Sequence, residues 1–215
     1  MKTDTIGNLT FYNADNLEIM RGMKDNEFDL AIVDPPYGIN VNPNMGLCKG
    51  QKKRHKSINW DDNVPPAVYF EELFRISIHQ IIWGGNYFNL PPTRHFIFWD
   101  KLNPEGLSFS DGEMAWTSFD RAIRKWAMRN CSGGKIHPTE KPIALYGWII
   151  KNYAKPGDKI LDTHLGSGSI AIAIEKANRI NGMELQFTGI ELDEEYYNAA
   201  LQRFKILAMQ QTIMW

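Results

Sequence analysis

Short apolar runs bounded by turn residues recur along this 215-residue chain, and segments with helical spacing lie between several of them. The apolar runs predict strands at residues 9–12, 28–33, 80–83, 95–99, 114–119, 159–162 and 187–191. Helical patterns cover residues 16–23, 142–153, 169–177 and 194–209. Strands that alternate with helices predict an α/β fold built on a doubly wound, mostly parallel sheet. Little helix separates the strands between residues 80 and 119, which favours antiparallel strands at one edge of that sheet.

The length and composition are typical of one globular domain, which we expect to span residues 1–215 with a full hydrophobic core. No apolar run is long enough to cross a bilayer, and the first residues lack the pattern of a secretory signal. Cys48 and Cys131 have no paired spacing. We therefore expect neither a disulfide framework nor a cysteine metal site, and we expect a cytoplasmic location.

Two stretches, residues 38–66 and 120–136, carry no clear strand or helix pattern, and loops of this length in a compact domain are usually functional or mobile. Each contains a basic cluster without acids inside it: Lys52, Lys53 and Arg54 in the first, and Arg121, Arg124 and Arg129 in the second. Charge runs are often only solvated surface. In a chain of net charge −1, however, local basic clusters favour contact with the phosphates of a nucleic acid.

The sequence Asp34-Pro35-Pro36-Tyr37 follows the predicted strand at residues 28–33, at the edge where open α/β sheets bind ligands. The nitrogen of a ring-bound exocyclic amine is a poor nucleophile because its lone pair is delocalised. The Asp34 carboxylate and the Pro35 carbonyl can accept hydrogen bonds from the two N–H groups of such an amine, and two prolines hold that carbonyl in place. Tyr37 offers a flat face on which a base can stack. The plainer interpretation of Asp-Pro is a turn that ends the strand.

A glycine turn, running from Asp162 through Gly166, Ser167 and Gly168 to Ser169, separates a predicted strand from a predicted helix. Such turns let a ligand approach the backbone, and the amides of the helix N-terminus favour a negative group. The third glycine of the dinucleotide fingerprint is absent, which favours S-adenosylmethionine over NAD. Glu191 ends the next strand, where a carboxylate can bind both ribose hydroxyls. A helix-capping acid is the alternative for Glu191.

The sequence His-Pro-Thr-Glu-Lys-Pro, at residues 137–142, precedes a predicted helix. Its position alone favours an ordinary helix cap, with proline as the first helical residue.

Taken in order, these motifs resemble the N4/N6 amino-methyltransferase family of DNA. The resemblance rests on Asp-Pro-Pro-Tyr at residues 34–37, Trp-Gly-Gly-Asn-Tyr-Phe at 83–88, His-Pro-Thr-Glu-Lys-Pro at 137–142, the glycine turn at 166–169 and Gly-Ile-Glu-Leu-Asp at 189–193. The catalytic motif precedes the glycine turn, as in the permuted beta group of that family. The resemblance implies a Rossmann-like methyltransferase fold, S-adenosyl-L-methionine as the cofactor and DNA as the partner.

The resemblance also implies roles for single residues. Asp34, Pro35, Pro36 and Tyr37 match the catalytic motif, and Asp162, His164, Gly166, Ser167, Gly168, Ser169 and Glu191 match the cofactor site. Lys141 matches a segment beside the methionine end of the cofactor, and Asp15 matches the position that meets its adenine ring. His164 departs from the usual motif, and we expect it to be packed and neutral. Only about twenty residues stand where many relatives carry a target-recognition region.

Four functions remain open on the sequence. We expect methylation of the N6 of adenine in a base flipped out of DNA, because serine more often leads the motif of cytosine-N4 enzymes. Cytosine-N4 methylation, a non-catalytic partner subunit and an NAD-linked oxidoreductase are the alternatives. No metal and no membrane partner is expected, and a homodimer is left open.

Overall fold

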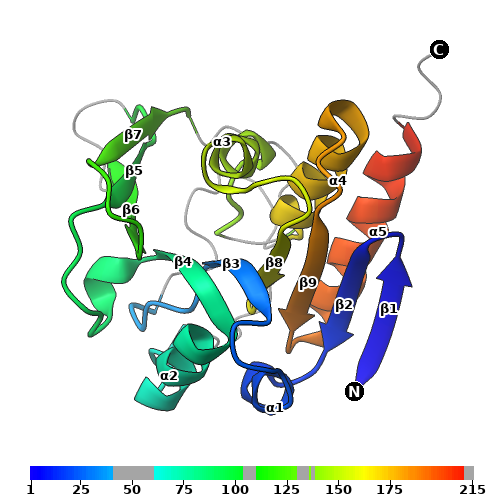
Figure 1. The fold of residues 1–215 in the computed structure, drawn as a ribbon, viewed down its shortest axis with the longest axis horizontal. Coiled ribbons are helices and arrows are strands. Elements are labelled where there is room, and N and C mark those ends of the chain that lie inside the picture. Colours follow the sequence, from blue (N-terminus) through cyan, green and yellow to red (C-terminus); the bar gives the residue numbers. More distant parts are fainter. Residues whose placement is uncertain (41–60, 104–109, 130–135, 137–138, 211–215) are drawn as a thin grey trace, which may run out of the picture.

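A computed structural model describes residues 1–40, 61–103, 110–129, 136 and 139–210 of the chain. Its centre is a nine-stranded sheet (Figure 1). Across the sheet the strands lie in the order β1 (Lys2–Ile6), β2 (Leu9–Asn13), β9 (Gln186–Glu191), β8 (Lys159–Asp162), β3 (Phe28–Val33), β4 (Ser77–Trp83), β6 (Gly112–Thr117), β5 (Phe96–Asp100) and β7 (Arg124–Ala127).

The middle of this sheet is parallel. Strands β2, β9, β8, β3 and β4 run in the same direction, so their carboxyl ends meet at one edge. At one side β1 is antiparallel to β2, and at the other β6 is antiparallel to both β4 and β5. The expectation of a mostly parallel sheet with antiparallel strands toward its edge is confirmed.

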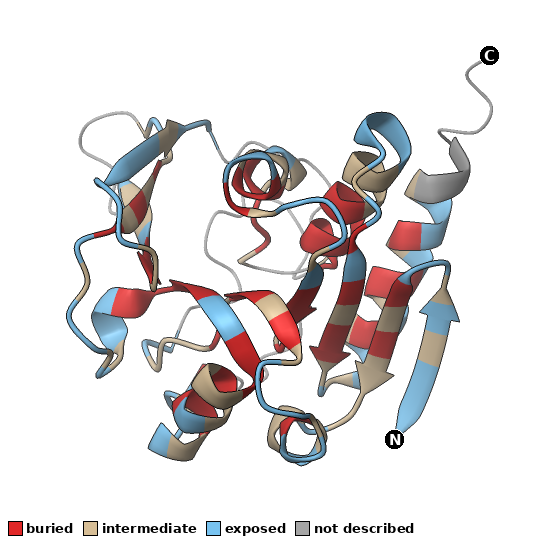
Figure 2. Cartoon of the chain, viewed as in Figure 1, coloured by how far each residue is buried: buried red, intermediate tan, exposed pale blue. Residues whose placement is uncertain are grey.

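Helices cover both faces of the sheet (Figure 1). Helices α1 (Asn16–Arg21) and α2 (Ala67–Ile76) lie on one face, and α3 (Ile143–Tyr153), α4 (Ser169–Asn181) and α5 (Glu194–Gln210) lie on the other. Strand β3 is apolar on both sides, as a central parallel strand must be. Leu30 and Ile32 join the core under α3, α4 and α5, whereas Ala31 and Val33 join the core over α1 and α2 (Figure 2).

Four of the described elements were not expected from the sequence: β1, α2, β7 and the short 3-10 helix η1 (Gly85–Tyr87). Strand β1 is largely polar and exposed, and it is held by pairing with β2. Helix α2 has apolar residues at helical spacing, but Pro66 at its N-cap supplies no side-chain hydrogen bond. Strand β7 lies in the stretch 120–136 that we expected to be loop, where Trp126 packs near Trp99 with ring centroids 6.5 Å apart.

Among the described residues no helix is both long and apolar enough to cross a membrane.

Candidate functional site

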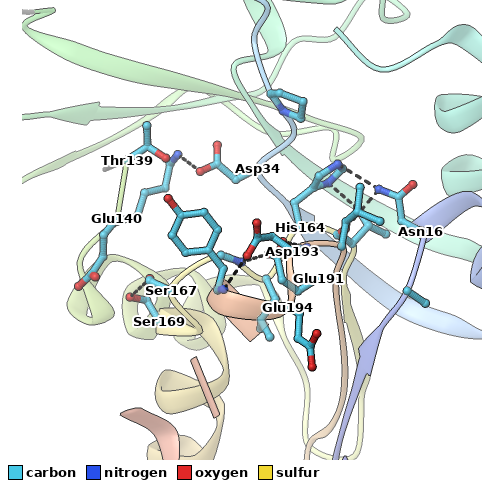
Figure 3. Close-up of a pocket in the computed structure, with 18 of the residues that line it drawn as sticks. Asn16, Asp34, Thr139, Glu140, His164, Ser167, Ser169, Glu191, Asp193 and Glu194 are labelled. Atoms are coloured by element: carbon cyan, nitrogen blue, oxygen red, sulfur yellow. Dashed lines mark hydrogen bonds and ion pairs between the residues drawn. The ribbon is translucent and has the colours of Figure 1, made fainter. Parts of the chain in front are cut away.

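A cavity of about 720 Å³ opens at the carboxyl edge of the parallel strands (Figure 3). It is lined by residues that follow β2, β3, β8 and β9, together with the segment that precedes α3. Nine of the residues singled out by the sequence line it: Asp15, Asp34, Pro36, Lys141, His164, Gly166, Ser167, Ser169 and Glu191. Pro35, Tyr37, Asp162 and Gly168 are their chain neighbours but do not line the cavity. The topology therefore gathers motifs from distant parts of the sequence.

The carboxylate of Asp34 receives hydrogen bonds on both of its oxygens. The Tyr37 hydroxyl donates to Oδ1 at 2.7 Å, and the Lys141 ammonium donates to Oδ2. Burial raises the pKa of Asp34, and the charge of Lys141 opposes that rise. The pKa of Lys141 is itself raised, because the neighbouring carboxylates outweigh the effect of its burial. Lys141 is therefore charged and in contact with the expected catalytic acid.

Glu113, on β6, is a second carboxylate at the same place, and the sequence interpretation missed it. Its side chain lies 3.0 Å from the Lys141 ammonium and 2.6 Å from that of Lys101. Burial alone would raise the pKa of Glu113, but the two lysines lower it to about 2. The ring of Trp83 lies 5.1 Å from the same Lys141 ammonium. One charge cluster thus contains the carboxylates of Asp34 and Glu113 and the ammonium groups of Lys101 and Lys141, of which Lys141 is buried and the other three are partly buried.

The ring of Tyr37 is closely packed. It stacks on Tyr87 with centroids 5.0 Å apart and planes 12° from parallel, and a Cβ added to Gly84 would lie 2.2 Å from it. Gly84 also has a φ of 68°, where other residues are strained. The Asp61 carboxylate accepts the amides of Tyr37 and Gly38 at 2.7 and 3.0 Å. The sequence predicted that a flipped base would stack on Tyr37, whereas in the structure the ring stacks on Tyr87. The sequence did not predict the bond from the Tyr37 hydroxyl to Asp34.

Glu191, the last residue of β9, lines the same cavity, and β8 separates its strand from β3, which Asp34 follows. Its two oxygens accept backbone amides, from Gly166 at 2.8 Å and from Asp193 at 3.0 Å. Burial raises the pKa of Glu191. The Asp193 carboxylate, rather than that of Glu191, accepts the Tyr196 amide in the first turn of α5, at 3.0 Å. Glu191 is therefore not the helix-capping acid that we considered as an alternative.

The start of the glycine turn is buried and held by local bonds. The Asp162 carboxylate accepts the His164 amide at 3.0 Å, and burial raises the pKa of Asp162 to about 8. Burial lowers the pKa of His164 to about 4, so its ring is neutral at neutral pH, which agrees with our expectation. The Asn16 amide lies 3.1 Å from His164 Nε2. Asp15 accepts the Glu18 amide as the cap of α1 and also lines the cavity.

Residues 137–138 lie outside the described residues, but the rest of that motif does not act as an ordinary helix cap. Helix α3 begins at Ile143, and Pro142 is its N-cap without a side-chain cap bond. Glu140 instead forms a 2.7 Å ion pair with Arg203 of α5. Arg203 also donates to the Ser167 carbonyl and to Ser169 Oγ, at 2.8 and 3.0 Å. Arg203, which the sequence interpretation missed, thus ties this segment to the glycine turn.

The structure describes three of the six predicted phosphate-binding residues: Arg121, Arg124 and Arg129. Lys52, Lys53 and Arg54 lie outside the described residues. Arg121 donates to the Asn152 carbonyl at 3.1 Å and lies 5.2 Å from the ring of Tyr153, at the end of α3 remote from Lys141. Arg124 begins β7, and Arg129 follows that strand at the cavity edge of the sheet. Of these three arginines, Arg129 is the one near the cavity edge.

The comparisons with known proteins agree with this arrangement. Residues 116–202 match the model of a family described as DNA methylase. The type II methyltransferase M2.DpnII of Streptococcus pneumoniae is 30% identical over 165 residues, which cover 75% of this chain and 54% of that protein. The chain thus spans about half the length of this curated relative.

Solved structures share the fold. The structure of the M1.HpyAVI-SAM complex superposes with a TM-score of 0.57 and 21% identity, over 91% of this chain and 99% of that one. The cytosine-N4-specific PvuII DNA methyltransferase gives a TM-score of 0.59 with 14% identity, over 96% and 93% of the two chains. The sheet and its two helical layers are a Rossmann-like methyltransferase fold. The chain is thus similar to N6/N4 DNA methylases in sequence over residues 116–202 and in fold over nearly its whole length.

Proposed function

We propose that this protein is an S-adenosyl-L-methionine-dependent DNA methyltransferase that acts on an exocyclic amine of a flipped-out base. One observation carries the proposal: the carboxylates of Asp34 and Glu191, which come from strands on either side of β8, line a single cavity (Figure 3). The Asp34 carboxylate can accept a hydrogen bond from an amine that becomes cationic, and the Glu191 carboxylate can accept hydrogen bonds from the two hydroxyls of a ribose. The family and the fold support the same activity.

The cofactor end of the cavity fits S-adenosyl-L-methionine in size and chemistry. A volume of about 720 Å³ is within the usual range for ligand pockets. Each oxygen of Glu191 accepts one amide, and a carboxylate has about four acceptor sites, so sites remain for two ribose hydroxyls. The amides at the start of α4 favour the cofactor's carboxylate. The cofactor supplies an electrophilic methyl group on a sulfonium.

The chemistry at Asp34 needs an ionised acceptor and no strong base. The target nitrogen gains positive charge as it attacks, so its hydrogen bond to Asp34 strengthens toward the transition state. The Pro35 carbonyl is the expected second acceptor. Burial disfavours the charge of Asp34, and Lys141 offsets this effect. We therefore assign Lys141 to Asp34 rather than to the methionine end of the cofactor.

Adenine N6 is the proposed target, because an aspartate leads the catalytic motif at position 34. Cytosine N4 is the alternative, and the fold does not separate the two, since a cytosine-N4-specific enzyme shares it. DNA is the proposed partner, and the cytoplasm is the proposed location. We propose that the protein contacts DNA through Arg129 and through the basic stretch before residue 60. Sedimentation of the free protein tests whether it acts as a homodimer.

The test uses mixed-sequence DNA, methyl-labelled cofactor and mass analysis of the released nucleosides. We expect N6-methyladenine. N4-methylcytosine would move the assignment to the alternative base. Binding of cofactor and DNA without transfer would support a non-catalytic partner subunit, and binding of NAD in place of S-adenosyl-L-methionine would overturn the proposal.

A further inference from the structure

The donors that contact Asp34 have a second acceptor within reach. The Tyr37 hydroxyl lies 2.7 Å from Asp34 and 3.4 Å from Glu113 Oε2. The Lys141 ammonium contacts Asp34 and lies 3.0 Å from the same Glu113 oxygen. In the free protein both donors are directed mainly at Asp34. A target amine must therefore compete with them for the carboxylate that is expected to receive it.

We propose that Glu113 is a positioning residue for methyl transfer: as an alternative acceptor for Tyr37 and Lys141, it releases Asp34 to receive the target amine. This inference rests on the proposed function and adds a residue to its mechanism. Glu113 does not line the cavity, so it acts through its two neighbours.

The sheet fixes Glu113 in place. It is the second residue of β6, and its Cα pairs with that of Trp99 on β5. Lys101, just after β5, contacts its other oxygen, Oε1, at 2.6 Å. Glu113 Oε2, which faces Tyr37 and Lys141, is therefore held at a constant position while those side chains adjust.

Each carboxylate of the cluster keeps a positive partner in both arrangements. Asp34 and Glu113 carry two negative charges, and Lys141 and Lys101 carry two positive charges. If Lys141 moves closer to Glu113, the developing positive charge on the amine replaces it at Asp34. No buried charge is left without a partner, which would otherwise be strongly unfavourable.

The test compares Glu113→Gln with Glu72→Gln under single-turnover conditions on a defined DNA. Glu72 is a matched control because its side chain is also 20% exposed and paired with a cation, Arg75, on α2. We expect Glu113→Gln to slow transfer about tenfold, the scale of one hydrogen bond to a charged group. Cofactor affinity should be unchanged. The acid limb of the pH profile should move to lower pH, because the negative charge of Glu113 raises the pKa of Asp34.

A double variant isolates the contact with Tyr37. Tyr37→Phe removes one donor, so Glu113→Gln should be less harmful in that background than alone. If Glu113→Gln fails to fold, Glu113→Asp keeps the charge next to Lys101 but shortens the reach. Glu113→Asp should then be slow, and a normal rate would overturn the inference.

The outcomes separate the two proposals. An inactive unmodified protein would overturn both. An active protein in which Glu113→Gln matches Glu72→Gln, or in which the double variant shows no coupling, would overturn the role of Glu113 alone.

Discussion

Two carboxylates at the carboxyl ends of parallel strands β3 and β9, which β8 separates, are held in opposite ways. Asp34, after β3, receives its hydrogen bonds from the side chains of Tyr37 and Lys141. Glu191, at the end of β9, receives its bonds from the backbone amides of Gly166 and Asp193. Side chains can change partner during a reaction, whereas backbone amides in a packed turn cannot. The proposed reaction end of the cavity is therefore adjustable, and the proposed cofactor end is fixed.

The electrostatics differ in the same way. Burial raises the pKa of both carboxyl groups. A full positive charge, that of Lys141, offsets the effect at Asp34, whereas at Glu191 the offset comes from amide dipoles. A carboxylate that meets a developing cation must be ionised, and Lys141 supports that state. One that binds neutral hydroxyls needs mainly its acceptor sites.

The largest expected effect is the loss of methyl transfer when the Asp34 carboxylate is removed. Asp34→Ala should lower the single-turnover rate by a factor of roughly 10² to 10³, the cost of losing one preorganised group at a transition state. Cofactor affinity, set by the Glu191 end, should change little. Rapid-quench kinetics and calorimetry on the same variant measure the two quantities. Near-normal turnover would contradict the mechanism.

Removing the lysine tests the charge at that end. Lys141→Met should shift the acid limb of the rate profile upward by roughly one to three pH units, the usual influence of one adjacent opposite charge. The sign follows because Lys141 lowers the pKa of Asp34, and Asp34 must be ionised to act. The rate should recover as pH rises through the new limb. An unmoved limb with weakened cofactor binding would instead place Lys141 at the methionine end.

The cofactor end should respond in binding rather than in rate. Glu191→Gln should raise the dissociation constant of S-adenosyl-L-methionine by a factor of roughly 10 to 100, the range for hydrogen bonds to a charged group. The rate at saturating cofactor should be nearly normal. Glu194→Gln is a suitable control, because it removes an exposed carboxylate from the same cavity. Equal effects of the two variants would refute a specific role for Glu191.

The smallest effect concerns DNA. Arg129→Ala should reduce the slope of log affinity against log salt by about one, the contribution of one phosphate contact. Arg124→Ala should reduce it less, because Arg124 lies at the other end of β7 from the cavity edge. Fluorescence anisotropy at several salt concentrations measures both slopes. A larger loss for Arg124 would move the DNA path to the opposite edge of the sheet.

The sequence predicted the elements whose apolar residues define them. Strand β3 is apolar at every position except Asp29 because it is buried on both faces, and its bounds were predicted as observed. The two outermost strands, β1 and β7, were not predicted. Each is paired on one side only and carries mostly exposed side chains, so no apolar pattern marks it. Such strands are determined by their partners rather than by their own residues.

The site also contains residues that the sequence predicted and residues that it did not. Asp34 and Glu191 were predicted because each lies in a motif that is continuous in the sequence. Glu113 and Arg203 act through contacts with residues distant in the chain, and no local pattern identifies such a partner. Glu113 does share a face of β6 with buried Ala115 and Thr117, and an acid in that alternation was the available signal. The predicted strand began at residue 114, one position too late to show it.

Gly84 has no functional group, yet the site is sensitive to its replacement. Its backbone has a φ of 68°, and the ring of Tyr37 occupies the space where any side chain would begin. A single methyl group there would collide with the ring of Tyr37 and displace it. In a survey of random variants, Gly84 would therefore score as an essential position although it contributes only empty space. Laboratory evolution of new base preferences will have to leave this residue unchanged.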